Sequence, residues 1–147
     1  MQLTRKAEYA IGAMVDLAYH QDEPYVLSRD VALREGIPLK LVAQIVSALG
    51  KAGWVKGTRG SQGGIRLIVD PAKVTVKEII ELIEGPIAIN KCLEKDSKCE
   101  RRASCAIKGM WAKAQKELVG VLEGTTIADL VEVKKRIDRQ EPGTDRG

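Results

Sequence analysis

Hydrophobic side chains in the first half of the chain recur at the spacing of a helix in two separate stretches. In residues 3–20 they fall three and four positions apart, which predicts an amphipathic helix with Thr4 as its N-cap. The apolar positions of this helix are Leu3, Ala7, Ala10, Ile11, Met14, Leu17 and Ala18. A second helix is predicted with Pro38 in its first turn and its end near Gly53, and its buried stripe is made of Leu41, Val42, Ile45, Val46 and Leu49.

A shorter helix is predicted between these two. Ser28 is the expected N-cap, the sequence "RDVALREG" follows it, and Gly36 is expected to close the helix. The preceding "EPYVLS" is expected to form a short extended link. Because a tight Gly-Ile-Pro turn joins the short helix to the next one, the pair predicts a helix-turn-helix.

The segment "WVKGTRGSQGGIRLIVD" has the form of two strands around a glycine-rich loop. Residues 54–56 and 65–69 are predicted to be extended, and residues 57–64 form the turn between them. The "GSQGG" run lies between two strands and does not open a helix, so it is not a nucleotide-binding fingerprint. A hairpin after a helix-turn-helix predicts a winged helix-turn-helix.

The second half of the chain is predicted to be mostly helical. Thr75 and Glu78 have the spacing of a capping box for a helix that runs through Glu84, and Thr126 and Asp129 are spaced in the same way before the last helix. Between them, one long helix ending at Gly124 is marked by a stripe of Ile107, Met110, Trp111, Ala114, Leu118, Val121 and Leu122. The predicted fold class is therefore mainly α with a small β-hairpin wing.

Four regions are expected along the chain. Residues 1–84 form the winged helix-turn-helix domain, 85–106 a cysteine loop, 107–139 a dimerisation helix and a C-terminal helix, and 140–147 a flexible tail. A helix of about 20 residues beyond a small domain exposes an apolar stripe, so we expect it to pair with its copy in a homodimer. The alternative is that this stripe packs on the first helix of its own protomer.

Composition and charge narrow the class of protein. Hydrophobic residues make up 44% and charged residues 30%, no apolar run approaches the roughly 20 residues of a membrane span, and no signal peptide is visible, so a cytoplasmic protein is expected. From Gly36 to Val69 there is no acidic residue. The basic residues of this segment are Lys40, Lys51, Lys56, Arg59 and Arg66. A solvated basic surface would explain them, but on a winged helix-turn-helix they favour contact with DNA phosphates.

All three cysteines of the chain, Cys92, Cys99 and Cys105, lie within fourteen consecutive positions. Cytoplasmic thiols stay reduced, so clustered cysteines indicate metal binding or redox chemistry before a disulfide framework. Gaps of six and five residues are wider than those of the paired cysteines in structural zinc sites. The spacing favours an iron-sulfur cluster, and zinc, a thiol redox switch and plain buried cysteines remain as alternatives.

Four motifs occur together in one order along the chain. They are "MQLTRKAEYAIGAMVDLA", "LVAQIVSALGKAGWVKGTRGSQGG", the cysteine loop with "CAIKGMW", and "TIADLV". With them the chain resembles the Rrf2 family of bacterial winged-helix regulators from Met1 to about Val133, particularly its iron-sulfur members. The resemblance implies a homodimeric transcription factor that is not an enzyme, a repressor in the simplest case. It implies a [2Fe-2S] cluster, or else a [4Fe-4S] cluster, on the three cysteines. The expected DNA-binding residues are Ser28, Lys40, Gln44, Lys51, Arg59 and Gly60, with Arg59 entering the minor groove.

The fourth cluster ligand is the point where the sequence departs from part of this family. Members that control cluster biogenesis carry a histidine at the position of Lys108, and a lysine ammonium is a poor ligand. Other members use a carboxylate from the partner subunit near the N-terminus, which implies Glu8 here. Glu8 could also be an exposed helical residue, and His20, the only histidine, is expected at the surface. The remaining candidates are a water, a small thiol, or a loop carboxylate among Glu94, Asp96 and Glu100.

The expected function is a DNA-binding regulator that senses iron-sulfur, redox or nitric oxide status. Changes in cluster occupancy are expected to reorder residues 90–105, shift the long helices and alter the separation of the two recognition helices. Two other classes stay open: a zinc-stabilised or thiol-redox winged-helix regulator, and an iron-sulfur electron-transfer protein. The acid-free basic segment argues against the last of these.

Overall fold

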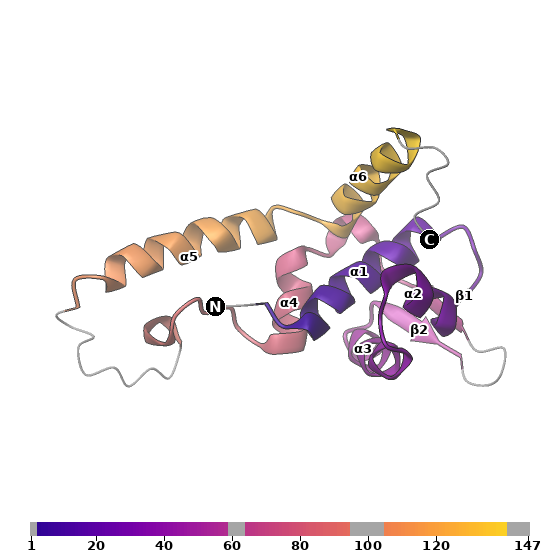
Figure 1. Ribbon diagram of the computed structural model, residues 1–147, viewed down its shortest axis with the longest axis horizontal. Coiled ribbons are helices and arrows are strands. Elements are labelled where there is room, and N and C mark those ends of the chain that lie inside the picture. The colour runs from indigo at the N-terminus through magenta and orange to yellow at the C-terminus, as the bar shows by residue number, and fades with distance from the viewer. Residues whose placement is uncertain (1–2, 59–63, 95–104, 141–147) are drawn as a thin grey trace.

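The computed structural model describes residues 3–58, 64–94 and 105–140. Its α-helices in these ranges are α1 (Arg5–Tyr19), α2 (Ser28–Glu35), α3 (Leu39–Lys51), α4 (Val76–Glu84), α5 (Lys108–Glu123) and α6 (Ile127–Gln140). The strands are β1 (Val26–Leu27), β2 (Val55–Gly57) and β3 (Gly64–Leu67), and the short 3-10 turns are η1 (Pro71–Lys73) and η2 (Lys91–Leu93). The predicted fold class, mainly α with a small β wing, is confirmed (Figure 1).

Helix α1 is the centre of the packing in the winged part of the molecule. It contacts α2, α3, α4, α6 and β3, so every other element of this part is placed relative to it. Its predicted apolar stripe is buried at Ala7, Ala10, Met14, Leu17 and Ala18. The largest fully buried apolar side chains are Met14, Leu17, Ile45, Leu49, Ile65, Ile79 and Ile127. The core therefore joins α1, the helix-turn-helix, the wing and the start of α6.

The wing is a three-stranded antiparallel sheet in the order β1-β3-β2. Val55 pairs with Leu67 in the predicted hairpin, and the link before α2 supplies a further strand in which Val26 pairs with Ile65. Gly64 is required at the start of β3, because a Cβ there would lie 2.7 Å from the Cβ of Tyr25 and 3.2 Å from the Val26 oxygen. The sheet thus holds the start of the helix-turn-helix against the base of the wing.

Three of the four predicted N-caps are confirmed. The Thr4 hydroxyl accepts from the Ala7 N–H, and Thr75 with Glu78 forms a complete capping box. Thr126 and Asp129 exchange the corresponding pair of hydrogen bonds at α6. The fourth prediction is wrong: Ser28 is the first residue of α2, and Leu27 stands at the N-cap without a side-chain bond. Pairing with β3 keeps the chain extended through Leu27, which moves the helix start by one residue.

Helix α5 extends away from the winged part, and α6 turns back toward α1 (Figure 1). α5 packs against α4 and η2 and buries none of its residues completely. The alternative that its stripe packs on the protomer's first helix is therefore not what the structure shows. Its most exposed apolar side chains are Ile107 (54%), Met110 (55%) and Val121 (67%). Across the described ranges, no helix is both long enough and apolar enough for a membrane crossing.

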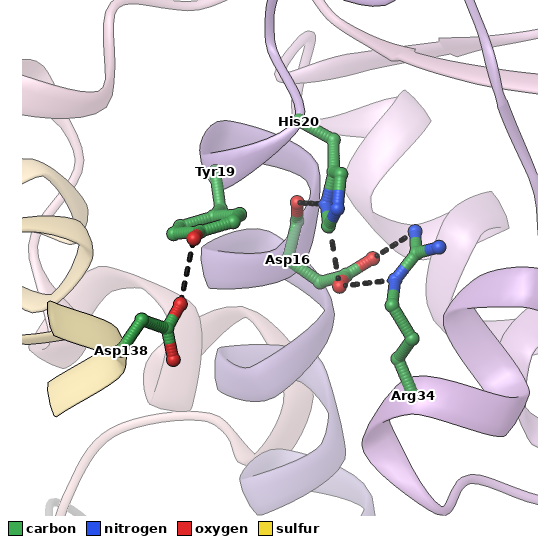
Figure 2. Close-up of polar contacts among 5 residues, drawn as sticks. All are labelled: Asp16, Tyr19, His20, Arg34 and Asp138. Carbon is green, nitrogen blue, oxygen red and sulfur yellow. Dashed lines mark hydrogen bonds and ion pairs between the residues drawn. The ribbon is translucent and has the colours of Figure 1, made fainter. Parts of the chain in front are cut away.

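A polar junction joins α1 to α2 and lies close to α6 (Figure 2). Asp16 is the one completely buried charged side chain in the described part of the chain. Arg34 donates to it twice, from Nε to Oδ1 at 2.8 Å and from Nη2 to Oδ2 at 2.9 Å, and this bonding raises the pKa of the guanidinium. On the α6 side, Tyr19 donates to Asp138 at 2.6 Å, and Lys134 lies over the Tyr19 ring. None of these contacts was predicted from the sequence.

Candidate DNA interface and cysteine loop

Helix α3 has one buried face and one polar face. Val42, Ile45 and Leu49 are buried, whereas a polar stripe at spacings of four, three and four residues is exposed. This stripe consists of Lys40, Gln44, Ser47 and Lys51. Residues at such spacings share one side of a helix, so two ammonium groups and one carboxamide are presented together. This combination suits a groove in which phosphates flank base edges.

The wing also carries exposed basic side chains. Lys56 of β2 is directly opposite Arg66 of β3, both side chains are exposed, and neither is in an ion pair with a described residue. Like charges directly opposite each other destabilise a sheet unless an anion lies nearby. The sequence indicated both residues as basic, but only the strand register shows that they are neighbours. Arg59 and Gly60, the predicted wing contacts, lie outside the described residues, and Ser28 is half-buried at the start of α2.

The cysteine loop is described at its two ends. Cys92 lies in η2 and Cys105 lies three residues before α5, both are half-buried, and Cys99 falls outside the described residues. The Lys108 N–H donates to the Cys105 carbonyl at 3.4 Å, so this cysteine lies beside the N-terminal turn of α5. Cysteine sulfur is the ligand that iron-sulfur clusters use and one that zinc also accepts, so the two described cysteines are of the right chemical kind to hold either.

The candidate fourth ligands differ in their exposure and in their contacts with other residues. Glu8 is exposed in the first turn of α1 and is in no ion pair with a described residue. His20 is half-buried, contrary to the surface position expected, and its Nδ1 donates to the Asp16 carbonyl oxygen at 2.9 Å. Glu94 is exposed next to η2, and Lys108 is half-buried. Within the described ranges alone, no three histidine, cysteine or acidic side chains gather closely enough to hold a metal ion. Asp96 and Glu100 lie outside those ranges together with Cys99.

Comparison with known proteins places this geometry among transcription factors. The model of a family described as "Rrf2: Iron-dependent Transcriptional regulator" matches residues 3–133. The HTH-type transcriptional regulator IscR of Aliivibrio salmonicida is 34% identical over 143 residues, covering 95% of this chain and 84% of that protein.

Solved structures show the same arrangement of elements. T. potens IscR superposes with a TM-score of 0.72 at 30% identity over 100% of this chain and 94% of that one. CymR, the global cysteine regulator of B. subtilis, superposes with a TM-score of 0.73 at 28% identity, over 90% of this chain and 98% of that one. These relatives are similar over nearly their whole length, so α5 and α6 belong to the shared architecture.

Proposed function

Because the chain belongs to the Rrf2 family of transcriptional regulators, we propose that it binds operator DNA under the control of an iron-sulfur cluster held by Cys92, Cys99 and Cys105. It is a regulator and not an enzyme. The observation that carries the proposal is the position of the cysteine loop. Cys92 lies in η2, which packs against α5, and Cys105 lies three residues before α5. Both described ends of the loop are therefore attached to the long helix.

The DNA-binding half of this function rests on the exposed faces of α3 and the wing. Lys40 and Lys51 would contact phosphates on either side of Gln44, and Lys56 and Arg66 would extend these contacts. A homodimer formed through the exposed stripe of α5 presents two copies of α3. Two-fold proteins of this kind read half-sites about 34 Å apart, one turn of the double helix.

The control half rests on the three thiolates and on α5. A bound cluster supplies a redox-active centre whose potential depends on its ligands and their hydrogen bonds. Holding Cys92 and Cys105 in one coordination sphere fixes η2 relative to the start of α5. α6 comes soon after α5 in the chain and packs on α1. A movement of α5 that begins at its N-terminal end would therefore pass through α6 to α1 and the winged part. In a dimer the separation of the two α3 helices would change with it.

The test is to purify the protein without oxygen from the cytoplasm of an expression host and to measure iron, sulfide and zinc per protomer. Binding to a duplex selected from a random pool is then followed across a salt series, with and without the cluster. Iron and sulfide together with cluster-dependent DNA affinity support the proposal. Zinc alone indicates the zinc-stabilised regulator. Metal-free protein whose DNA affinity changes on oxidation indicates a thiol switch, and a cluster without salt-dependent DNA binding indicates electron transfer.

Replacing Gln44 by alanine is expected to weaken DNA binding by about 1 to 3 kcal/mol, mainly at one base position. The exposed carboxamide can donate to and accept from one adenine, whereas its loss leaves the phosphate contacts in place. Arg59→Ala on the wing is expected to weaken binding to all sequences. Competition between duplexes with single base changes measures both effects. Gln21→Ala, which removes an exposed carboxamide outside α3, is the control. Equal loss across all sequences for Gln44→Ala would contradict base reading at this position.

Replacing Glu8 by alanine tests whether the partner subunit supplies the fourth ligand. The carboxylate is exposed and is a harder, more replaceable ligand than a thiolate, so the variant is expected to assemble a cluster with an altered spectrum and a shorter lifetime. Its DNA affinity should lose most of its dependence on the cluster. Visible absorption and DNA affinity at one salt concentration give the two readouts. Glu132→Ala, an exposed carboxylate on α6, should change neither. An unchanged spectrum with an unchanged affinity ratio rules Glu8 out.

A further inference from the structure

Helix α2 is a short element with little apolar anchoring of its own. Of its eight residues only Val31 is buried, and Leu33 is 79% exposed on the outer side. Val31 and the partly buried Ala32 hold the middle of the helix on the core, and such small apolar contacts constrain its direction weakly. The orientation of α2 must therefore depend on contacts at its two ends, and this orientation matters because α2 supports α3, the recognition helix.

The two ends of α2 are held in different ways. At the N-terminal end, the preceding strand β1 pairs with β3, so the wing fixes the chain as far as Leu27. At the C-terminal end, Arg34 donates two hydrogen bonds to the buried Asp16 of α1 (Figure 2). Arg34 is two residues before Gly36, whose φ of 63° turns the chain toward α3. The ion pair thus links the last turn of α2 to α1 just before the turn of the helix-turn-helix.

A buried ion pair is a weak way to gain stability. Removing a carboxylate from water costs free energy, and this cost offsets most of the attraction between the two charges. Apolar residues of similar volume often stabilise the folded state as well or better. A paired guanidinium and carboxylate is strict in geometry, because two parallel hydrogen bonds fix both distance and angle. What this pair gives the protein beyond an apolar contact is a defined orientation of α2 on α1.

We propose that Asp16 is a positioning residue for DNA recognition, which acts through Arg34 to fix the C-terminal end of α2 and hence the direction of α3. The inference rests on the DNA binding proposed above and adds to it a residue far from the exposed face of α3. The polar junction also has a hydrogen bond to α6, in the second half of the chain. Tyr19, three residues after Asp16, donates to Asp138 of α6, so α6 is anchored beside the same contact.

Glu35 completes the surroundings of the pair. Its carboxyl is half-buried against Gly12, where a Cβ would lie 2.9 Å from Oε2, and burial raises its pKa. The charged and titratable groups that face it come from three helices: Asp16 and His20 from α1, Arg34 from α2 and Lys134 from α6. The end of α2 is therefore surrounded by charged groups from α1 and α6 as well as by the ion pair.

The test is Asp16→Asn, which keeps the volume but removes the charge and one of the two acceptors. Binding is measured to a duplex that the wild-type protein selects from a random pool and to a scrambled duplex of the same length. We expect affinity for the selected duplex to fall about tenfold, the size of one lost base contact, and affinity for the scrambled duplex to stay within about twofold. Phosphate contacts by long lysine side chains tolerate a tilted α3, whereas base contacts do not.

Two further variants separate positioning from stability. Ile79→Val in α4 destabilises the core away from the helix-turn-helix, and it should leave both affinities unchanged at a temperature well below unfolding. Arg34→Lys keeps the charge but loses the paired geometry, and it should reproduce the loss of discrimination even if Asp16→Asn does not fold. Unchanged discrimination in every folded variant at these two positions overturns the proposal. A wild-type protein that selects no duplex would instead contradict DNA binding itself.

Discussion

Alanine at Cys92, Cys99 or Cys105 is expected to abolish cluster binding or to reduce it severely. Clusters of this kind are usually held by four protein ligands, and this chain offers three thiols, so each substitution removes a ligand from an incomplete set. The fold should survive, because the two described cysteines are only half-buried and their loss leaves no large cavity. Iron and sulfide content and visible absorption of anaerobic protein measure the effect, and circular dichroism measures the fold.

The matched control is Glu94→Ala, which changes an exposed side chain two residues after Cys92. It should keep a wild-type spectrum if the fourth ligand is elsewhere. A wild-type spectrum in any cysteine variant would remove that cysteine from the proposed set. Cluster loss should also make DNA affinity equal in anaerobic and air-exposed protein, since the thiolates would no longer fix η2 against the start of α5.

Arg34→Met is expected to lower the free energy of unfolding by about 3 kcal/mol, the low end of the range for broken buried pairs. The low end applies because Arg34 is 35% exposed and the pair is partly solvated. The substitution leaves the carboxylate of Asp16 buried without the guanidinium, and the His20 ring, whose Nδ1 is 3.5 Å from Oδ1, stays beside it. Asp16→Asn should cost much less, because Arg34 can turn toward water while asparagine remains neutral. Arg34→Met is therefore expected to cost more than Asp16→Asn, because Asp16 is the buried partner.

Urea unfolding at one fixed protein concentration gives both values, so that any self-association contributes equally to the two measurements. The double variant Asp16→Asn with Arg34→Met is the control, and it should be more stable than Arg34→Met alone since no buried charge remains. If Asp16→Asn proves the more damaging of the two single variants, the carboxylate is not the desolvated partner and the account of the junction is wrong.

Most of the helical fold could be predicted from local patterns. The stripe of α1, the helix-turn-helix with its Gly36 turn, and the caps at Thr4, Thr75 and Thr126 all depend on residues within a few positions of each other. The strand β1 was expected only as an extended link, because its two residues become a strand by pairing with β3, nearly forty positions later. The same pairing explains why Ser28 does not cap α2.

The polar junction could not be predicted for a related reason. An aspartate beside an apolar stripe is normally expected in solvent, and the partner that allows Asp16 to be buried is eighteen positions away. The neighbouring positions of Lys56 and Arg66 likewise required the register of the wing. The exposed face of α3 with Lys40, Gln44 and Lys51 follows from helical spacing, because the predicted stripe of α3 occupies the opposite side. The chemistry of the cysteines remains a prediction.

Association through the exposed apolar side chains of α5 would make DNA binding by this regulator depend on its own abundance. If two chains must associate through this helix before both α3 helices reach DNA, operator occupancy at low concentration follows the square of the protein concentration. A twofold change in the number of molecules would then change occupancy roughly fourfold, by mass action alone. A regulator built in this way responds steeply to its rate of synthesis as well as to its signal. Halving the concentration would then lower operator occupancy as much as about fourfold without any change at the cysteines.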